Sequence, residues 1–176
     1  MDRLLEKDTL IVNESPTSKD ILMANFNFSI GRSYFSNSSG GYLGWGLGAA
    51  IGAKLAAPKR RVVACLGDGS SMFGLQGLWT LAKYRAPLIV IVFNNRAYMA
   101  VKNQFRGSEE RIRLAAEMGA ELVGPELNFA RLAETFGIFG QRVEQPDAIE
   151  PAIKLAMEQN GPALIDVIIG QNTRKD

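Results

Sequence analysis

Two short runs of apolar, β-branched residues place the strongest constraint on the fold of this 176-residue chain. Residues 61–66 and 88–93 are each long enough for one strand, and Arg61 is their only charged residue. Such runs are typical of strands in a parallel sheet that helices cover on both faces. Further strands are expected at residues 9–13, 141–143 and 163–169. Because helical patterns lie between these strands, we predict an α/β fold with a doubly wound, mostly parallel sheet and helices on both faces.

The expected helices are recognised by apolar spacing and by residues that cap or end helices. Asn128 is the expected N-cap of one of them, and Pro58 is expected to end the glycine-rich one. The helices are expected at residues 18–26, 44–56, 72–84, 97–105, 109–121, 128–135 and 147–159. Small polar residues at 31–39 indicate a loop.

Polar residues follow both central strands at the point where each strand is expected to end. Gly67-Asp68-Gly69-Ser70 follows the first and Asn94-Asn95 follows the second. The carboxyl ends of parallel strands meet at one edge of the sheet, where ligands bind in folds of this kind. Mg²⁺ prefers oxygen ligands and takes only some of them from protein. We therefore predict a metal site made of Asp68, Asn95 and the backbone carbonyl of Ala97. Asn94 is expected to begin the turn.

The residues around Asp68 are suited to a phosphate group. Gly67 and Gly69 allow a sharp turn and a close approach to a ligand. Ser70 and Ser71 are expected at the start of a helix, whose free N–H groups favour anions. A diphosphate held through a magnesium ion would satisfy all of these features.

This combination of motifs resembles the C-terminal diphosphate-binding domain of thiamine diphosphate-dependent enzymes. The similarity extends to Asn13-Glu14-Ser15-Pro16-Thr17-Ser18, Gly40-Gly41-Tyr42-Leu43-Gly44, Ala49-Ala50-Ile51-Gly52 and Asn94-Asn95-Arg96-Ala97-Tyr98. It covers roughly residues 9 to 170 and is strongest towards benzoylformate decarboxylase-like and acetolactate synthase-like members. The resemblance implies the thiamine diphosphate-binding fold, thiamine diphosphate and Mg²⁺ as cofactors, and a small 2-oxo acid as substrate.

The resemblance also implies roles for single residues. The carbonyl of Gly41 would accept a hydrogen bond from the aminopyrimidine, and Leu43 would lie beneath the cofactor and impose its bent shape. Thr17 and Tyr98 would contact the diphosphate. Val101 and Gln104 would face the substrate.

Three positions depart from the family pattern. Gly48 stands where proline is common, and Pro16 stands where a hydroxyl residue is usual, so that Thr17 and Ser15 become the expected phosphate contacts. Gln104 stands where the aromatic-acid decarboxylase carries an aromatic residue, which argues against benzoylformate itself as the substrate.

The chain resembles one domain of a family whose members normally have about three. Residues 1–176 would form a single diphosphate-binding domain, and the pyrimidine-binding and middle domains would be absent from the chain. The resemblance implies that the catalytic glutamate comes from a partner's pyrimidine domain, so no catalytic residue is assigned here, Glu14 included. The chain has no histidine. We therefore expect it to be inactive alone, either as a fragment or as the subunit of a split enzyme.

The predicted function is the cofactor-binding part of a 2-oxo acid decarboxylase. The alternatives are an acetolactate synthase-like carboligase component and a non-catalytic cofactor-binding module. A weaker alternative is an NAD or FAD domain, because residues 44–49 fit a Gly-x-Gly-x-x-Ala fingerprint and Asp68 follows at a suitable distance for a ribose contact. The polar residues before Gly44 make a poor strand, however, and this hypothesis leaves Asn94-Asn95 unexplained.

Composition limits the possible partners and location. The net charge of +2 and the scattered basic residues argue against a nucleic-acid partner. One cysteine excludes a disulfide within the chain, and no secretory signal is visible, so a cytoplasmic location is expected.

The glycine-rich segment indicates a partner chain, not a membrane. Its apolar part, residues 42–53, is shorter than the roughly 20 residues that a bilayer requires. Gly44, Gly48 and Gly52 recur every four residues and would lie on one helix face that another backbone can approach. We expect a homo-oligomer, with a dimer as the minimum.

Overall fold

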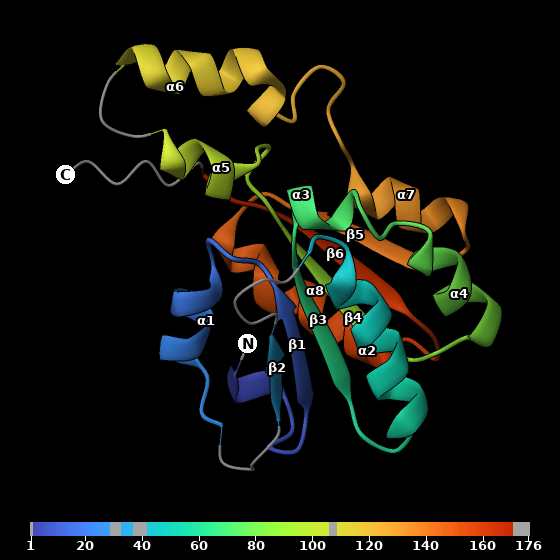
Figure 1. The fold of residues 1–176 in the computed structure, drawn as a ribbon. Coiled ribbons are helices and arrows are strands. Elements are labelled where there is room, and N and C mark those ends of the chain that lie inside the picture. The colour runs from blue at the N-terminus through green and yellow to red at the C-terminus, as the bar shows by residue number, and fades with distance from the viewer. Residues whose placement is uncertain (1, 29–32, 37–41, 106–108, 171–176) are drawn as a thin grey trace.

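A six-stranded parallel sheet forms the centre of the computed structural model, which describes residues 2–28, 33–36, 42–105 and 109–170 (Figure 1). The strand order is β2-β1-β3-β4-β6-β5, and every pairing between these strands is parallel. The strands are β1 (Leu10–Glu14), β2 (Tyr34–Ser36), β3 (Val62–Gly67), β4 (Ile89–Asn94), β5 (Phe139–Val143) and β6 (Ala163–Ile168). The predicted doubly wound α/β sheet is confirmed.

Helices cover both faces of the sheet, as the alternation of patterns predicted (Figure 1). On one face, apolar side chains of α2, α4 and α7 pack on the sheet, and on the other those of α1 and α8 do so. The helices are α1 (Lys19–Asn25), α2 (Trp45–Ala56), α3 (Asp68–Ser71), α4 (Gly77–Tyr84), α5 (Met99–Gln104), α6 (Glu109–Ala115), α7 (Phe129–Thr135) and α8 (Ile149–Glu158). Short turns of 3₁₀ helix are η1 (Asp2–Leu4) and η3 (Pro146–Ala148), and a π turn is η2 (Ala116–Ala120).

Three elements differ from the sequence-based expectation. The expected loop at 31–39 contains the edge strand β2, whose three residues pair with β1 while the Tyr34 hydroxyl accepts a hydrogen bond from Asn13. The helix expected from residue 72 begins at Gly77, because the chain first passes close to α2: a Cβ on Gly74 would lie 3.0 Å from the carbonyl oxygen of Gly44. The helix expected at 109–121 is α6 followed by η2, where Gly119 has φ +83°.

The strand order places a crevice beside β1 and β3. The chain passes from β1 outward to β2 and then returns to β3 on the other side of β1. In open parallel sheets, ligands bind outside the carboxyl ends of the strands at such a reversal. Figure 1 shows α3 and α5 at this edge of the sheet. Among the described residues, no helix has the length and apolar character needed to cross a bilayer.

Candidate cofactor and metal site

Asp68 lies directly after β3 and is buried, with 2% of its surface exposed. Its Oδ1 accepts a hydrogen bond from the N–H of Gly69 at 2.9 Å, and its Oδ2 accepts one from the N–H of Ala97 at 3.1 Å. Burial raises the pKa of Asp68, and the hydrogen bonds from Gly69 and Ala97 partly offset this. No ion pair to Asp68 is found among the described residues. A buried carboxylate without a cation beside it is suited to a metal ion.

Asn94 and Asn95, at the end of β4, point to different partners. Asn95 Oδ1 accepts a hydrogen bond from the N–H of Ala97 at 3.0 Å. Asn94 Nδ2 donates to Asp166 Oδ1 at 3.0 Å, and Asn94 Oδ1 accepts from the N–H of Arg96 at 3.2 Å. Asn95 therefore faces the same backbone group as Asp68, whereas Asn94 holds the turn.

The turn after Asn95 adopts an uncommon backbone conformation. Arg96 has φ +60°, in the left-handed region that residues other than glycine rarely adopt. Hydrogen bonds from Tyr98 N to Ala120 O at 2.8 Å and from Leu122 N to Arg96 O at 2.7 Å fix the following residues. This turn brings the N–H of Ala97 to both the Asp68 carboxylate and the Asn95 amide.

Asp166 on β6 anchors this turn from within the sheet. It is 0% exposed, and its two oxygens accept from Asn94 Nδ2 and, at 3.1 Å, from the N–H of Phe129. Asp166→Ala should lower the free energy of unfolding by about 3 kcal/mol, because it leaves two buried donors without this acceptor. Urea denaturation would measure the loss. The exposed Asp147→Ala is the control and should change stability by less than about 0.5 kcal/mol; an equal effect of the two substitutions would contradict this role.

A cavity of about 100 Å³ lies at this edge of the sheet and includes most of the predicted site residues. Its walls come from the segment after β1, the start of α2, the β3–α3 turn, and β4 with α5. The lining residues are Pro16, Thr17, Ser18, Leu43, Gly67, Asp68, Gly69, Ser70, Phe93, Asn95, Ala97, Tyr98, Met99, Ala100 and Val101.

Some predicted site residues do not line this cavity. The Ser71 hydroxyl donates to the carbonyl of Gly67 at 2.8 Å. Ser15 is buried and donates to the side chain of Asn13. Gln104 is exposed at the end of α5. Gly41 lies outside the described residues.

The reason for glycine at position 69 is a protein contact. A Cβ there would lie 2.6 Å from Cδ1 of the Tyr98 ring. Tyr98 in turn packs edge-on against Phe73, with ring centroids 6.4 Å apart. Glycine at position 69 therefore allows the Tyr98 ring to pack directly against the turn. Tyr98 forms one side of the cavity.

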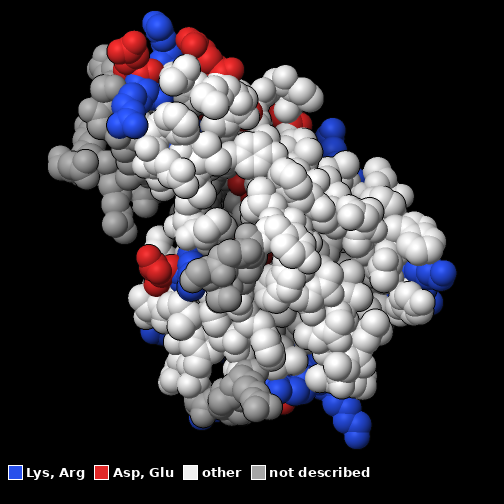
Figure 2. Space-filling view, viewed as in Figure 1, with Lys and Arg blue, Asp and Glu red and all other residues white. Residues whose placement is uncertain are grey.

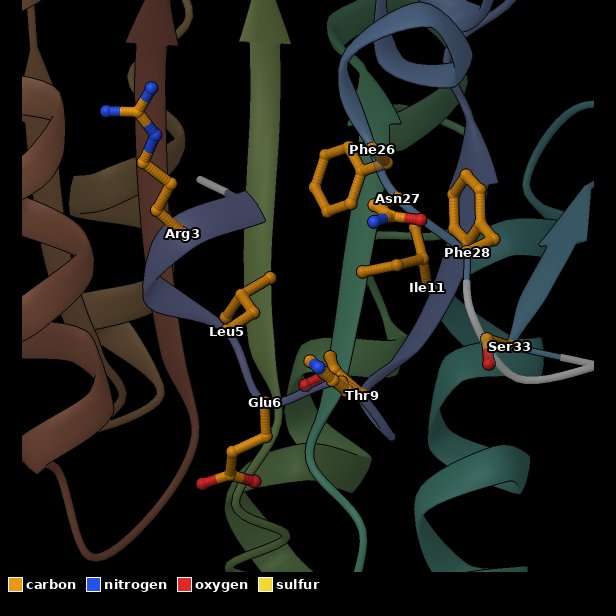
Figure 3. A pocket seen from close by; sticks show the side chains of 10 residues that line it. Arg3, Leu5, Glu6, Thr9, Ile11, Phe26, Asn27, Phe28 and Ser33 are labelled. Atoms are coloured by element: carbon orange, nitrogen blue, oxygen red, sulfur yellow. The ribbon is translucent and has the colours of Figure 1, made fainter.

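A larger hollow, of about 280 Å³, lies at the amino end of β1 (Figure 3). Phe26, Asn27 and Phe28 line it together with Thr9, which directly precedes the strand. Its only carboxylate is the exposed Glu6. Because it lies at the opposite end of the sheet from Asp68 and offers no set of buried oxygen donors, it is not the candidate metal site.

The donors around the smaller cavity are those of a hard cation. The described residues contain no group of three His, Cys, Asp or Glu side chains that could hold a metal. Asp68 and Asn95 would supply a carboxylate and an amide oxygen, and Ala97 would add its backbone carbonyl. Three oxygen donors leave positions for phosphate and water, which is how Mg²⁺ is usually held in proteins. The residues present therefore fit a magnesium-bound diphosphate.

Comparison with known proteins agrees with this chemistry. Residues 18–167 match the family model described as "Thiamine pyrophosphate enzyme, C-terminal TPP binding domain". Benzoylformate decarboxylase from Pseudomonas aeruginosa is 34% identical over 167 residues, which are 95% of this chain and 30% of that protein. A probable acetolactate synthase large subunit from Methanococcus aeolicus is 32% identical over 171 residues, which are 96% of this chain and 27% of that protein.

A solved structure shows the same fold. The thiamine diphosphate-dependent 4-hydroxybenzoylformate decarboxylase of Rhodococcus jostii matches with a TM-score of 0.84 and 33% identity, over 96% of this chain and 31% of that one. The chain thus spans about 30% of the length of these relatives. These matches favour the thiamine diphosphate family over the NAD or FAD hypothesis for residues 44–49.

Proposed function

Because this chain belongs to the thiamine pyrophosphate enzymes and corresponds to their C-terminal cofactor-binding domain, we propose that it binds thiamine diphosphate through Mg²⁺ as part of a 2-oxo acid decarboxylase. One observation carries this proposal: Asp68 and Asn95, from the ends of adjacent strands, meet at the N–H of Ala97 beside one cavity. Asp68, Asn95 and the carbonyl of Ala97 would hold the metal. Thr17, Ser70 and Tyr98 would contact the diphosphate, and Leu43 would support the cofactor.

When bound, thiamine diphosphate supplies an electron sink for chemistry at a 2-oxo acid carbonyl. This chain's residues would orient the cofactor and exclude water. Asp68 is the only carboxylate that lines the described cavity, and the metal would occupy it. Acid–base catalysis would therefore depend on a partner, in line with the pyrimidine-domain glutamate that the family resemblance implies.

A carboligase similar to acetolactate synthase is the second candidate, because the Methanococcus aeolicus relative, 32% identical to this chain, is a probable acetolactate synthase large subunit. The two activities differ in their products. To distinguish them, this chain would replace the matched segment of the Pseudomonas aeruginosa relative, and the chimera would be given pyruvate or benzoylformate. A decarboxylase should release CO₂ with one equivalent of aldehyde. A carboligase should release one CO₂ for each two pyruvates consumed. A chimera that binds the cofactor and does neither would indicate a non-catalytic module.

A mostly apolar face is available for a partner domain or a second copy. Figure 2 shows charged side chains over α6, at the lower end and at the left and right edges, while the middle of this face shows few of them. Several large apolar side chains near α2 and α4 are more than half exposed, namely Tyr42, Leu55, Phe73, Trp79 and Tyr84. Exposed apolar areas of this kind mark interfaces. We propose that a second copy of this chain and domains like the others of its relatives cover them, in a cytoplasmic enzyme.

Gly48→Leu tests this interface without disturbing the fold. Gly48 is exposed on α2, and a Cβ there would meet nothing within 4 Å. Leucine also favours the helix relative to glycine. We expect self-association to weaken by about tenfold or more, because extra bulk in a packed interface costs about 1–3 kcal/mol. Sedimentation at several concentrations would measure it. Gly161→Leu, at another open position, should leave association unchanged; a wild-type chain that is monomeric at tens of micromolar would refute the proposal.

A further inference from the structure

Glu14 is a buried acid that the proposed metal site does not use. It is the last residue of β1 and is 6% exposed. Its Oε1 accepts a hydrogen bond from the N–H of Gly44 at 2.8 Å, and its Oε2 accepts one from the N–H of Gly46 at 2.6 Å. Each carboxylate oxygen therefore holds one N–H group at the start of α2. Glu14 does not line the cofactor cavity itself.

The start of α2 is also confined by its neighbours. Gly44 has φ +92°, and a Cβ on it would lie 2.6 Å from the carbonyl oxygen of Phe73. A Cβ on Gly46 would lie 2.7 Å from Cβ of Glu14. The segment thus runs between Glu14 on one side and Phe73 on the other, at distances that only glycine permits.

This contact joins two walls of the cofactor cavity. Leu43, directly before Gly44, lines the cavity from the α2 side. Pro16, Thr17 and Ser18 line it from the segment that follows β1, beginning two residues after Glu14. No backbone hydrogen bond between these two walls is found among the described residues. The two hydrogen bonds of Glu14 therefore give a polar link between these two segments within the described part of the chain.

We propose that Glu14 is a positioning residue: its carboxylate holds the start of α2 against the end of β1 and thereby sets the place of Leu43 relative to Thr17 in the cofactor cavity. This inference rests on the proposed function. A carboxylate suits the role because both of its oxygens accept and hydrogen bonds to an ionised acceptor are short and strong. The N-terminal end of α2 favours the negative charge. Burial raises the pKa of Glu14, while the N–H groups of Gly46, Gly44 and Trp45 partly offset this.

Glu14→Gln in the full 176-residue chain tests the inference, because glutamine keeps the size of the side chain but offers only one oxygen. Its NH₂ group would face one of the two N–H groups. Calorimetric titration with thiamine diphosphate and Mg²⁺ should show a dissociation constant about 10- to 100-fold higher than that of the wild type, the range typical of residues that orient a binding group from behind. Amide NMR signals of Gly44 and Gly46 should shift, since one of them loses its acceptor.

Lys54→Met is the matched control, at the other end of the same helix. The Lys54 ammonium is buried and donates to the carbonyls of Pro58 and Arg60 at 3.0 and 2.7 Å, far from the cavity lining. This variant should lower the melting temperature but leave the affinity of the folded protein unchanged. A purely structural role of Glu14 would give the same outcome for Glu14→Gln as for Lys54→Met, and that result would overturn the proposal.

A second measurement needs no substitution and covers the case in which Glu14→Gln does not fold. Coupling between two sites is reciprocal, so cofactor binding should tighten the contact. Hydrogen exchange at the N–H groups of Gly44 and Gly46 should slow when thiamine diphosphate and Mg²⁺ are added to the wild-type chain. Binding without this slowing would refute the role of Glu14 alone. A wild-type chain that binds no cofactor would refute the proposed function and this inference together.

Discussion

Asp68→Ala should weaken the Mg²⁺-dependent binding of thiamine diphosphate by more than about 100-fold. Loss of a residue behind the metal ligands typically costs 10- to 100-fold in affinity, and Asp68 is the proposed ligand itself. Without its carboxylate, the diphosphate would lose the cation that neutralises it. Calorimetric titration of the chain or its assembled complex, with and without Mg²⁺, would measure the change.

Two variants make this experiment specific. Asp147→Ala removes an exposed acid of the same kind and should bind as the wild type does. Asn95→Ala should weaken binding with Mg²⁺ and have little effect on the residual binding without it. Affinity in Asp68→Ala equal to that of the wild type would remove Asp68 from the metal site, even if the chain still bound the cofactor.

The isolated chain should show no decarboxylation of any 2-oxo acid, whereas the chimera with the Pseudomonas aeruginosa relative should be active. The described cavity contains one carboxylate, which the metal would occupy, and the chain has no histidine. General acid–base catalysis is worth about 10² to 10⁴-fold, so its loss alone would lower turnover by that factor. CO₂ release by the purified chain, saturated with thiamine diphosphate and Mg²⁺, would measure this.

Turnover by the pure chain would show that an acid within it can serve the cofactor. Glu14 would then be examined first, since it is buried next to the start of α2. Glu14→Gln would distinguish the two explanations: it should abolish turnover if Glu14 is that acid, and should leave turnover in place if the activity comes from a contaminant.

The central strands and the ends of β3 and β4 were predictable from local sequence. Continuous β-branched runs have few alternatives to a buried parallel strand, and the residues that follow such strands meet at one edge. The meeting of Asp68 and Asn95 beside one cavity follows from this geometry. The choice of Asn95 over Asn94 as the metal-facing residue remains a prediction, although only Asn95 lines the cavity.

The remaining features depend on contacts between distant residues. Strand β2 has only three residues and gains its order from pairing with β1, which no local pattern reveals. Glu14 holds N–H groups 30 and 32 residues away, and Asp166 holds Asn94 from 72 residues away. A buried acid inside or at the end of a predicted strand is the signal that could have drawn attention to both, because such a group requires hydrogen-bond donors.

Locating the metal tests the proposed cofactor site most directly. The chain, alone or within the chimera, would be crystallised with thiamine diphosphate and Mn²⁺ in place of Mg²⁺, and anomalous scattering would identify the ion. We expect one peak within coordination distance of the Asp68 carboxylate, the Asn95 amide oxygen and the Ala97 carbonyl, with the diphosphate completing the shell. A bound cofactor whose metal lies elsewhere, or whose diphosphate does not contact the metal at Asp68, would contradict it.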